Sequence, residues 1–379
     1  MIPNNENLLE AARLADYPTP FFYTSRAVLT HNYQMFAHLI EDAEVCYAIK
    51  ANSDPKIIEH LNSLGSSFEA ASSYEIDLLL KLGVEPTRIV YGTSVKPSEH
   101  IHFAHEHGIN RFAADSKEEV EKIAKHAPGS KVFVRAVVDD TGSVFTFSER
   151  FGAPIEDLED IILYAKQLDL KTYGISFHVG SQATNENRWS NAISMIRPVI
   201  ENLYEKGVTL EMLNIGGGFP VIYYNHQHVP HLNEIVPHIK NSLHMLPYIP
   251  KIILEPGRGI VASSTALVAS IISRTVRGGK VWLCLDAGIY NALYEAMIHQ
   301  GSTQYTVHPF ARTIDSRVDF MHTTLAGPTG DSLDIISREV MLPSYLKEGD
   351  RLIFENAGAY TVTMSSPFNG FPKPELYIG

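Results

Sequence analysis

The chain has 379 residues, 31 of them basic and 43 acidic, and this acidic balance argues against a surface for nucleic acid or anionic membranes. The length favours two domains or one large barrel with an added part, while 45% hydrophobic and 20% charged residues exclude wholesale disorder. Only Cys46 and Cys284 carry thiols, the start is polar, and no apolar run reaches a membrane-spanning length, so a cytoplasmic protein without disulfides is expected.

Eight short runs rich in apolar, β-branched and aromatic residues follow one another from residue 45 to residue 257. Each ends in a polar or glycine-containing turn, as strands do, and segments with helical spacing separate them. In the segment after the first run, Ile57, Ile58 and Leu61 begin one apolar stripe. Most runs are apolar on both faces, so the alternation predicts an α/β fold with a parallel (β/α)8 TIM barrel over residues 28–262. The runs are 45–50, 66–72, 88–94, 110–116, 131–138, 173–181, 210–219 and 251–257.

After about residue 265 the pattern changes to strand-like alternation with little helical periodicity. The tetrapeptide Arg277-Gly278-Gly279-Lys280 lies between two such runs, and paired glycines at this place predict a tight hairpin turn. We therefore expect a mostly antiparallel β domain at the C-terminal end, residues 263–379, joined by residues 1–27 at the other end of the chain.

In a (β/α)8 barrel the active site lies at the carboxyl ends of the strands. Any one polar residue at a strand end could simply lie on the barrel rim. Several buried charged side chains on one face are different, because each needs a partner, and this convergence predicts a functional site. The residues that end or follow the runs are Lys50, Glu69, Arg135, His178, Ser181, the glycines 216–218, Glu255 and Arg258.

Three of these positions indicate particular chemistry. Lys50 ends a run that we expect to be buried, where a lysine is costly unless it is neutral or bound to a carbonyl, although it could also extend to the rim. The three glycines of Asn214–Phe219 would let backbone N–H groups approach an anion, or would only allow close packing. Glu255 could hold a ring nitrogen protonated and Arg258 could bind a phosphate; an ion pair between these two is the alternative.

The 17 histidines raise the question of a metal site. His178 has no second histidine or acid at metal-ligand spacing, so we expect no metal. A phosphate-binding loop, a carbonyl-reactive lysine, an acid for a ring nitrogen and an imidazole for a ring face together indicate pyridoxal 5'-phosphate. The remaining histidine pairs lie in polar segments and are expected on solvated surfaces: His100 and His102, His105 and His107, His226 and His228.

Nine ordered segments across nearly the whole chain resemble the fold type III pyridoxal-phosphate-dependent decarboxylases. These enzymes have an alanine-racemase-like barrel, and the segments are most similar to the branch that decarboxylates ornithine, diaminopimelate and lysine. Each segment alone is a weak signal, but the ordered set is a strong one. The segments are YAIKAN (47–52), FEAASSYE (68–75), RFG (150–152), FHVGS (177–181), NIGGGFP (214–220), EPGR (255–258), GPTGDSLD (327–334), GAYT (358–361) and FNGF (368–371).

The resemblance implies a role for most strand-end residues. Lys50 would hold the cofactor as a Schiff base, His178 would stack on its ring, and Glu255 would pair with the pyridine nitrogen. Glu69 and Arg135 would line the ring. The phosphate anchors implied by the resemblance are Ser181, Gly217, Gly218, Gly257, Arg258 and Tyr360.

The resemblance also implies a homodimer with active sites shared across the interface. The GDSLD segment would reach into the partner's site, where Asp331 would contact the distal group of a small amino-acid substrate. Phe368 would form a wall of the substrate pocket, and Tyr290 and His299 would lie beside it. The family's place in polyamine or siderophore biosynthesis is implied as well.

Three positions depart from the family. Gly330 stands where these decarboxylases usually carry the cysteine that reprotonates Cα, so the proton must come from elsewhere; His299, Lys50 and a held water are the candidates. Glu69 replaces the usual aspartate, and His299 lies near the place of an acid that binds the distal ammonium. The sequence therefore predicts a decarboxylase that removes the α-carboxylate of a basic or diamino acid, or of a derivative. The alternatives are a racemase or epimerase of the same fold and a regulatory homologue without activity.

Overall fold

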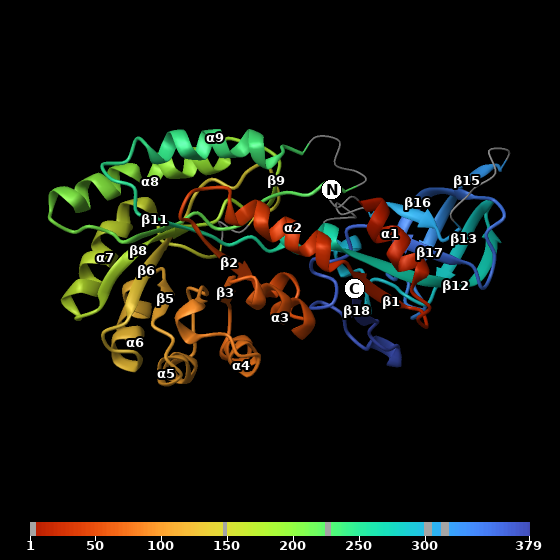
Figure 1. The fold of residues 1–379 in the computed structure, drawn as a ribbon, viewed down its shortest axis with the longest axis horizontal. Coiled ribbons are helices and arrows are strands. Elements are labelled where there is room, and N and C mark those ends of the chain that lie inside the picture. Colours follow the sequence, from red (N-terminus) through yellow and green to blue (C-terminus); the bar gives the residue numbers. More distant parts are fainter. Residues whose placement is uncertain (1–4, 147–149, 224–228, 299–304, 312–317) are drawn as a thin grey trace.

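The computed structural model describes residues 5–146, 150–223, 229–298, 305–311 and 318–379. Its larger part is a closed barrel of eight parallel strands in the order β10-β11-β2-β3-β4-β5-β6-β8 (Figure 1). Every predicted run overlaps one of these strands, so the predicted (β/α)8 barrel is confirmed. The strands are β2 (Glu44–Ala48), β3 (Ser67–Ala70), β4 (Ile89–Tyr91), β5 (Arg111–Ala114), β6 (Lys131–Ala136), β8 (Lys171–Phe177), β10 (Met212–Asn214) and β11 (Lys251–Leu254).

Helices cover the outside of the barrel. In α3 (Pro55–Ser63) the Asp54 side chain caps the first turn, a proline occupies the first helical position, and Ile57, Ile58 and Leu61 are buried against the strands. The predicted apolar stripe is therefore the face that packs on the barrel. The other helices around it are α2 (Arg26–Ala37), α4 (Ser73–Lys81), α5 (Ser98–Glu106), α6 (Lys117–His126), α7 (Leu158–Gln167), α8 (Arg188–Glu205) and α9 (Leu232–Leu243).

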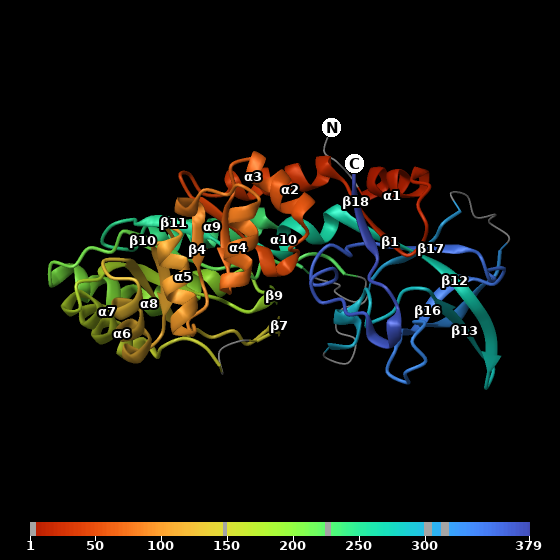
Figure 2. The ribbon, with the colours of Figure 1, turned by 90° about the horizontal axis from the view of Figure 1, so that it is seen from below.

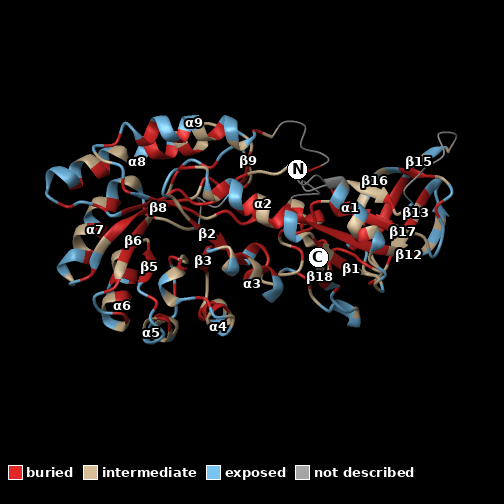
Figure 3. Ribbon diagram, viewed as in Figure 1, coloured by how far each residue is buried: buried red, intermediate tan, exposed pale blue. Residues whose placement is uncertain are grey.

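Most residues of the barrel strands are buried (Figure 3), and side chains at alternate strand positions fill the interior of such a barrel. Cys46 lies in this interior, and burial raises the pKa of its thiol well above the usual value. A thiol in such surroundings is inert, which gives Cys46 a packing role. Its neighbours in the cluster come from six other strands: Val90, Ala113, Phe133, Tyr173, Met212 and Ile253.

The second part is an eight-stranded, mostly antiparallel sheet, as predicted. The long strand β12 (Thr265–Arg277) turns through Gly278 and Gly279 into β13 (Lys280–Leu285), and the positive φ of both glycines confirms the predicted hairpin turn. Strand β1 (Phe21–Thr24), from the N-terminal region, pairs with β12 and with β18 (Glu375–Ile378). The remaining strands are β14 (Val307–Pro309), β15 (Phe320–Ala326), β16 (Ile335–Pro343) and β17 (Arg351–Phe354).

The barrel and the sheet lie side by side along the long axis of the molecule (Figure 2). The segment after β17 crosses to the barrel, where Asn52 donates a hydrogen bond to the Gly358 carbonyl at 2.9 Å and the Tyr360 N–H donates to Ala51 at 2.8 Å. These contacts bring Tyr360 to the carboxyl ends of the barrel strands. No helix in the described part of the chain is long and apolar enough to cross a lipid bilayer.

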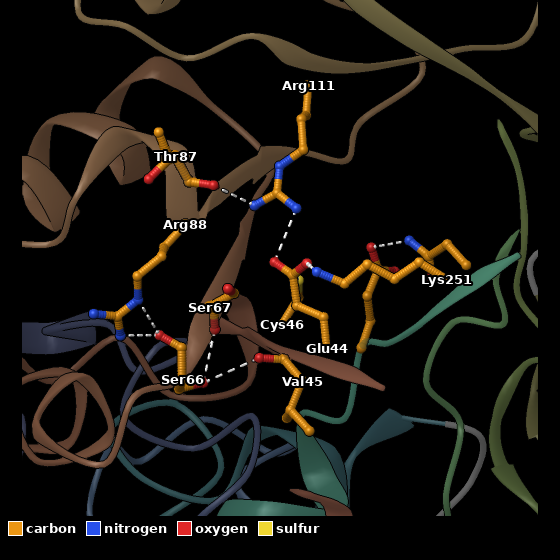
Figure 4. A network of polar contacts seen from close by, with 11 residues as sticks. Glu44, Val45, Cys46, Ser66, Ser67, Thr87, Arg88, Arg111 and Lys251 are labelled. Carbon is orange, nitrogen blue, oxygen red and sulfur yellow. Dashed lines mark hydrogen bonds and ion pairs between the residues drawn. The ribbon is translucent and has the colours of Figure 1, made fainter. Parts of the chain in front are cut away.

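A polar network closes the amino-terminal end of the barrel (Figure 4). Arg111 donates hydrogen bonds to the Glu44 carboxylate and to the Thr87 carbonyl, both at 2.8 Å, and Lys251 forms an ion pair with Glu44 at 2.8 Å. Burial raises the pKa of Glu44, but Arg111 and Lys251 outweigh this effect and lower the pKa to about 2. The network joins the first residues of β2, β5 and β11, an end of the barrel that serves stability.

We expect Glu44→Gln to lower the free energy of unfolding by about 3 kcal/mol at pH 7, because it leaves the buried Arg111 guanidinium without its charged partner. A depressed carboxyl pKa stabilises the fold above the unfolded value of 4.5 and loses this effect as pH falls toward 2. The wild type should therefore lose more stability than the variant over this range in urea titrations. Glu211→Gln, whose side chain is exposed, is the control; an equal loss in both variants would contradict the prediction.

Candidate active site

A cavity of about 440 Å³ opens at the carboxyl ends of the barrel strands. Eight of the residues that the sequence singled out contribute to its polar lining, so the fold brings them together. Four phenylalanines from the barrel complete much of the wall. The predicted residues in the lining are Lys50, Glu69, Arg135, His178, Ser181, Glu255, Arg258 and Tyr360, and the phenylalanines are Phe133, Phe145, Phe151 and Phe177.

Lys50 extends into this cavity from a 3₁₀ turn (Ile49–Ala51) that follows β2. Its side chain is 47% exposed, and its Nζ lies 3.5 Å from the Glu69 carboxylate. In the protein alone Lys50 therefore extends to the rim, the alternative that the sequence left open. The Glu69 charge raises the pKa of Lys50, against the opposing effect of desolvation. A nearby acid thus keeps the amine protonated until a ligand enters.

Glu255 follows β11 and receives a hydrogen bond from Asn214 Nδ2 at 2.6 Å. The Oδ1 atom of Asn214 accepts a bond from the Gly216 N–H at 2.9 Å, so one amide links the glycine loop to the acid. Burial, followed by the charge of Glu69, raises the pKa of Glu255 to about 7. An acid in this state can share a proton with a ring nitrogen. The sequence analysis missed Asn214, although its place at a strand end was the available signal.

His178 follows β8, and the Gly180 N–H donates to its Nδ1 at 3.0 Å. Burial and the charges of Arg135 and Lys50 hold the pKa of His178 well below its usual range. The ring is therefore neutral at pH 7 and suits stacking better than proton donation. Among the described residues, no three histidine, cysteine, aspartate or glutamate side chains gather as a metal site would require.

A small recess at the base of the cavity is lined by the predicted phosphate anchors Ser181, Gly218, Gly257, Arg258 and Tyr360. The tyrosine has a φ of +55°, a left-handed conformation that is uncommon for a bulky residue. This conformation places its ring 4.8 Å from the Arg258 guanidinium. The recess thus combines the Arg258 and Lys50 cations with hydroxyl groups and glycine backbone, a set suited to phosphate.

Arg258 pairs with Glu295, which the sequence analysis missed. Its Nη1 and Nη2 atoms donate to the two carboxylate oxygens at 2.7 and 2.6 Å, and Nη1 also donates to the Tyr223 hydroxyl at 2.9 Å. The expected alternative, an ion pair between Arg258 and Glu255, is therefore wrong. Glu295 also lines the cavity, and it lies 37 residues from Arg258 with no local pattern that connects the two.

Gly217 lines neither the cavity nor the recess. A Cβ at this position would lie 2.4 Å from the Glu255 carbonyl oxygen, so the missing side chain lets two strand-end loops pack closely. Gly218, with φ of +91°, would place a Cβ 2.2 Å from the Gly180 carbonyl oxygen. Close packing therefore requires both glycines, and Gly218 also lines the recess.

The predicted substrate residues form a separate group in the sheet part. The Tyr290 hydroxyl donates to Asp331 at 3.2 Å, and the rings of Tyr290 and Phe368 are 4.4 Å apart. Asp334 holds this turn through hydrogen bonds from the Ile289 N–H and the Thr329 hydroxyl. In the described part of the chain, the Lys50 cavity is not lined by Tyr290, Asp331 or Phe368. His299 lies outside the described residues.

Gly330 precedes Asp331 with a φ of +73° and with open space around the place of a Cβ. This left-handed backbone favours glycine over a residue with a side chain. The turn is thus built for the glycine that stands there, and the absence of the family's cysteine at this position matches the local backbone.

Comparison with known proteins agrees with this site. A model of the family described as "Pyridoxal-dependent decarboxylase, pyridoxal binding domain" matches residues 26–262, more than half of the chain. The chain belongs to this family. It is a pyridoxal-phosphate-dependent enzyme that decarboxylates an amino acid, as the sequence predicted.

Three relatives show the range of the family. The lysine/ornithine decarboxylase of Selenomonas ruminantium is 33% identical over 354 residues, which cover 93% of this chain and 88% of the relative. The Paramecium bursaria Chlorella virus arginine decarboxylase bound to agmatine has a TM-score of 0.90 at 26% identity, covering 99% of this chain and 100% of the viral one. Antizyme inhibitor 2 of Xenopus laevis is 31% identical over 374 residues, covering 94% and 80%.

The residues around the cavity fit pyridoxal phosphate. An amine stands beside a buried acid, one oxygen of which, Glu69 Oε2, has no hydrogen-bond partner among the described residues. A neutral imidazole, a carboxyl group with a raised pKa and a recess with an arginine lie around the same space. Lys50, His178, Glu255 and Arg258 would hold the aldehyde, the ring face, the ring nitrogen and the phosphate.

Proposed function

We propose that this enzyme removes the α-carboxylate of an amino acid with a basic distal group, and that its active site is completed by a second copy of the chain. The observation that carries the proposal is the convergence of Lys50, His178, Glu255 and Arg258 on one cavity at the barrel rim. When bound, pyridoxal phosphate supplies an aldehyde that captures the substrate amine and a ring that accepts the electron pair released with carbon dioxide.

Lys50, Glu255 and Arg258 each have one task in the proposal. Lys50 gives up its proton to bind the cofactor, and the adjacent Glu69 keeps a negative charge next to that nitrogen. Glu255, oriented by Asn214, holds a proton at the ring nitrogen and so favours the loss of carbon dioxide. Arg258 anchors the phosphate end, which fixes the distance between the reacting carbon and the Lys50 amine.

Reprotonation of Cα requires an acid other than the family's cysteine, because residue 330 is glycine. Lys50 is a candidate, since its amine lies in the cavity and its protonated form is favoured by Glu69. A held water is another, and so is His299, which lies outside the described residues. His178 is excluded by the depressed pKa of its ring.

The separate position of Tyr290, Asp331 and Phe368 supports a site shared between two chains. Asp331 is partly exposed and Phe368 is exposed, and neither lines the cavity of its own chain in the described residues. In the proposed homodimer, the barrel of residues 28–262 binds the cofactor, and the β-rich domain of residues 1–27 and 263–379 offers Asp331 to the partner's substrate. A carboxylate there suits a distal ammonium or guanidinium.

Mixing two inactive variants tests the shared site. We expect Lys50→Ala and Asp331→Ala to be inactive separately and to recover about a quarter of wild-type activity when refolded together, because half of the random dimers then carry one intact site of two. Tagged chains that co-purify establish that exchange took place. Exchange without any recovered activity would refute the shared site.

A substrate screen tests the reaction itself. The enzyme loaded with pyridoxal phosphate is offered lysine, ornithine, arginine and their acylated derivatives, with release of carbon dioxide and optical rotation as readouts. The relatives are named as decarboxylases of lysine, ornithine and arginine. We therefore expect release of carbon dioxide from at least one basic amino acid. Loss of rotation without release would favour the racemase, and cofactor binding without either would favour the regulatory homologue.

A further inference from the structure

Gly92 lies directly beside the acid that faces Lys50. Strands β3 and β4 are neighbours in the barrel, and the Gly92 N–H, just after β4, donates to the Ala70 carbonyl at 3.0 Å. A Cβ on Gly92 would lie 2.5 Å from Glu69 Oε1, 2.7 Å from its Cγ and 2.9 Å from its Cδ. Real Cβ atoms do not approach other atoms this closely, so Glu69 or the strand end would have to move.

The backbone at this position does not itself require a glycine. Its φ lies outside the positive range in which residues with side chains are strained. The three atoms nearest to the added carbon all belong to the Glu69 side chain, which is itself 4% exposed. The acid therefore explains the glycine.

The loop that carries Gly92 is held firmly. The Thr93 hydroxyl donates to the Ala71 carbonyl at 3.0 Å, and the buried Lys96 donates to the Thr93 carbonyl at 2.9 Å. Lys96 is fixed in turn by an ion pair with Glu119 at 2.8 Å. A side chain at position 92 would displace the Glu69 carboxylate before it displaced this loop.

We propose that Gly92 is a positioning residue of the active site, whose missing side chain gives the Glu69 carboxylate the room to stand beside the Lys50 amine. The inference rests on the proposed binding of pyridoxal phosphate to Lys50. It links two neighbouring positions: the acid at position 69 needs an empty position 92. Gly92 thereby sets how tightly Lys50 keeps its proton before the cofactor arrives.

Cofactor loading reports on this arrangement. The Lys50 nitrogen and the aldehyde carbon form a double bond, the aldehyde oxygen leaves as water, and the proton of the ammonium passes to the solvent. Glu69 raises the pKa of Lys50 more than any other neighbour does, so moving its carboxylate away eases the loss of that proton. The other charged or titratable groups around Lys50 are Tyr360, Glu255, Arg135, His178 and Glu75.

The test follows the loading of the unloaded full-length protein with pyridoxal phosphate from pH 6 to pH 10, by absorbance. We expect Gly92→Ala to shift the midpoint of the loading rate to lower pH by about one unit and Glu69→Gln to shift it further. In the Glu69→Ala background none of the three clashing atoms remains, so Gly92→Ala should add almost nothing, a non-additive cycle. Lys81→Ala, on the exposed side of α4, should leave the midpoint unchanged.

Equal shifts from Gly92→Ala in both backgrounds, or a loss of thermal stability without any shift, would overturn the proposal. If Gly92→Ala alone fails to fold, recovery of folding in the double variant supports it, and failure of the double variant refutes it. A wild-type protein that binds the cofactor without a lysine-dependent band would instead refute the proposed role of Lys50, so the two failures are distinguishable.

Discussion

Replacing Lys50 with alanine is expected to lower the rate of carbon dioxide release by at least about 1000-fold, because residues that bond to the reacting group act as a unit with the rest of the site. The variant should also lose the absorbance of covalently bound cofactor while it still binds pyridoxal phosphate through the recess. Rate and absorbance are measured on the same preparation, so that cofactor loss and loss of chemistry are separated.

Lys81→Ala is the matched control for this experiment. Lys81 lies on α4 with a side chain that is 72% exposed and paired with Asp77. It is not among the residues that line the cavity in the described part of the chain. The Lys81→Ala substitution should leave the rate of carbon dioxide release and the absorbance of covalently bound cofactor unchanged. A Lys50→Ala enzyme that retains the covalent absorbance would show that another lysine binds the cofactor, and the assignment would then be wrong.

Replacing Glu255 with glutamine should separate activity from stability. We expect the rate to fall by about 100- to 1000-fold, the usual effect of losing one preorganised electrostatic partner at the reacting centre. The amide keeps an oxygen that accepts the hydrogen bond from Asn214, so the loop geometry is retained. The substitution removes only the negative charge of Glu255, which would hold a proton at the ring nitrogen.

The same substitution should stabilise the protein without cofactor at alkaline pH. Burial raises the pKa of Glu255 from 4.5 to about 7, and an acid with a raised pKa gives its full contribution to stability below 4.5 and loses it as pH rises through 7. Glutamine carries no charge to bury, so its unfolding free energy should exceed that of the wild type by about 1 to 3 kcal/mol at pH 8 and by little at pH 5.

Urea unfolding at both pH values measures this difference, with Glu59→Gln on the exposed face of α3 as the control. A Glu255→Gln protein that is less stable than the wild type at pH 8 would mean that the charged acid is well compensated before cofactor binds. Normal activity in that variant would remove Glu255 from the proposed mechanism.

The separate roles of local and long-range information are clearest at the barrel. Each barrel strand is short, apolar and bounded by turns, and its helix carries one apolar stripe, so local patterns were sufficient to predict all eight strands. Parallel strands that alternate with helices must place their carboxyl ends together, and for this reason the residues ending the runs could be identified as one site.

Local sequence patterns could not predict which side chains the strand-end residues contact. Arg258 was expected to bind a phosphate, with an ion pair to Glu255 as the alternative; in the protein alone it pairs with Glu295, because the loop after β13 folds over the barrel rim. The run that Lys50 ends was expected to be buried, and the side chain projects from it into the cavity beside Glu69. Both outcomes depend on which loops close over the rim, and no spacing in the sequence encodes that.

The sequence by itself determined the barrel, the sheet beside it, the set of strand-end residues and, through nine ordered segments, the family and the cofactor. Only the tertiary structure decided the charge of the amine, the partner of the arginine, the reach of Glu69 past Gly92 and the separation of Asp331 from its own cavity. The reason is physical: periodicity and turn chemistry act between near neighbours in the chain, whereas pKa values and ion pairs follow from distances that the complete fold sets.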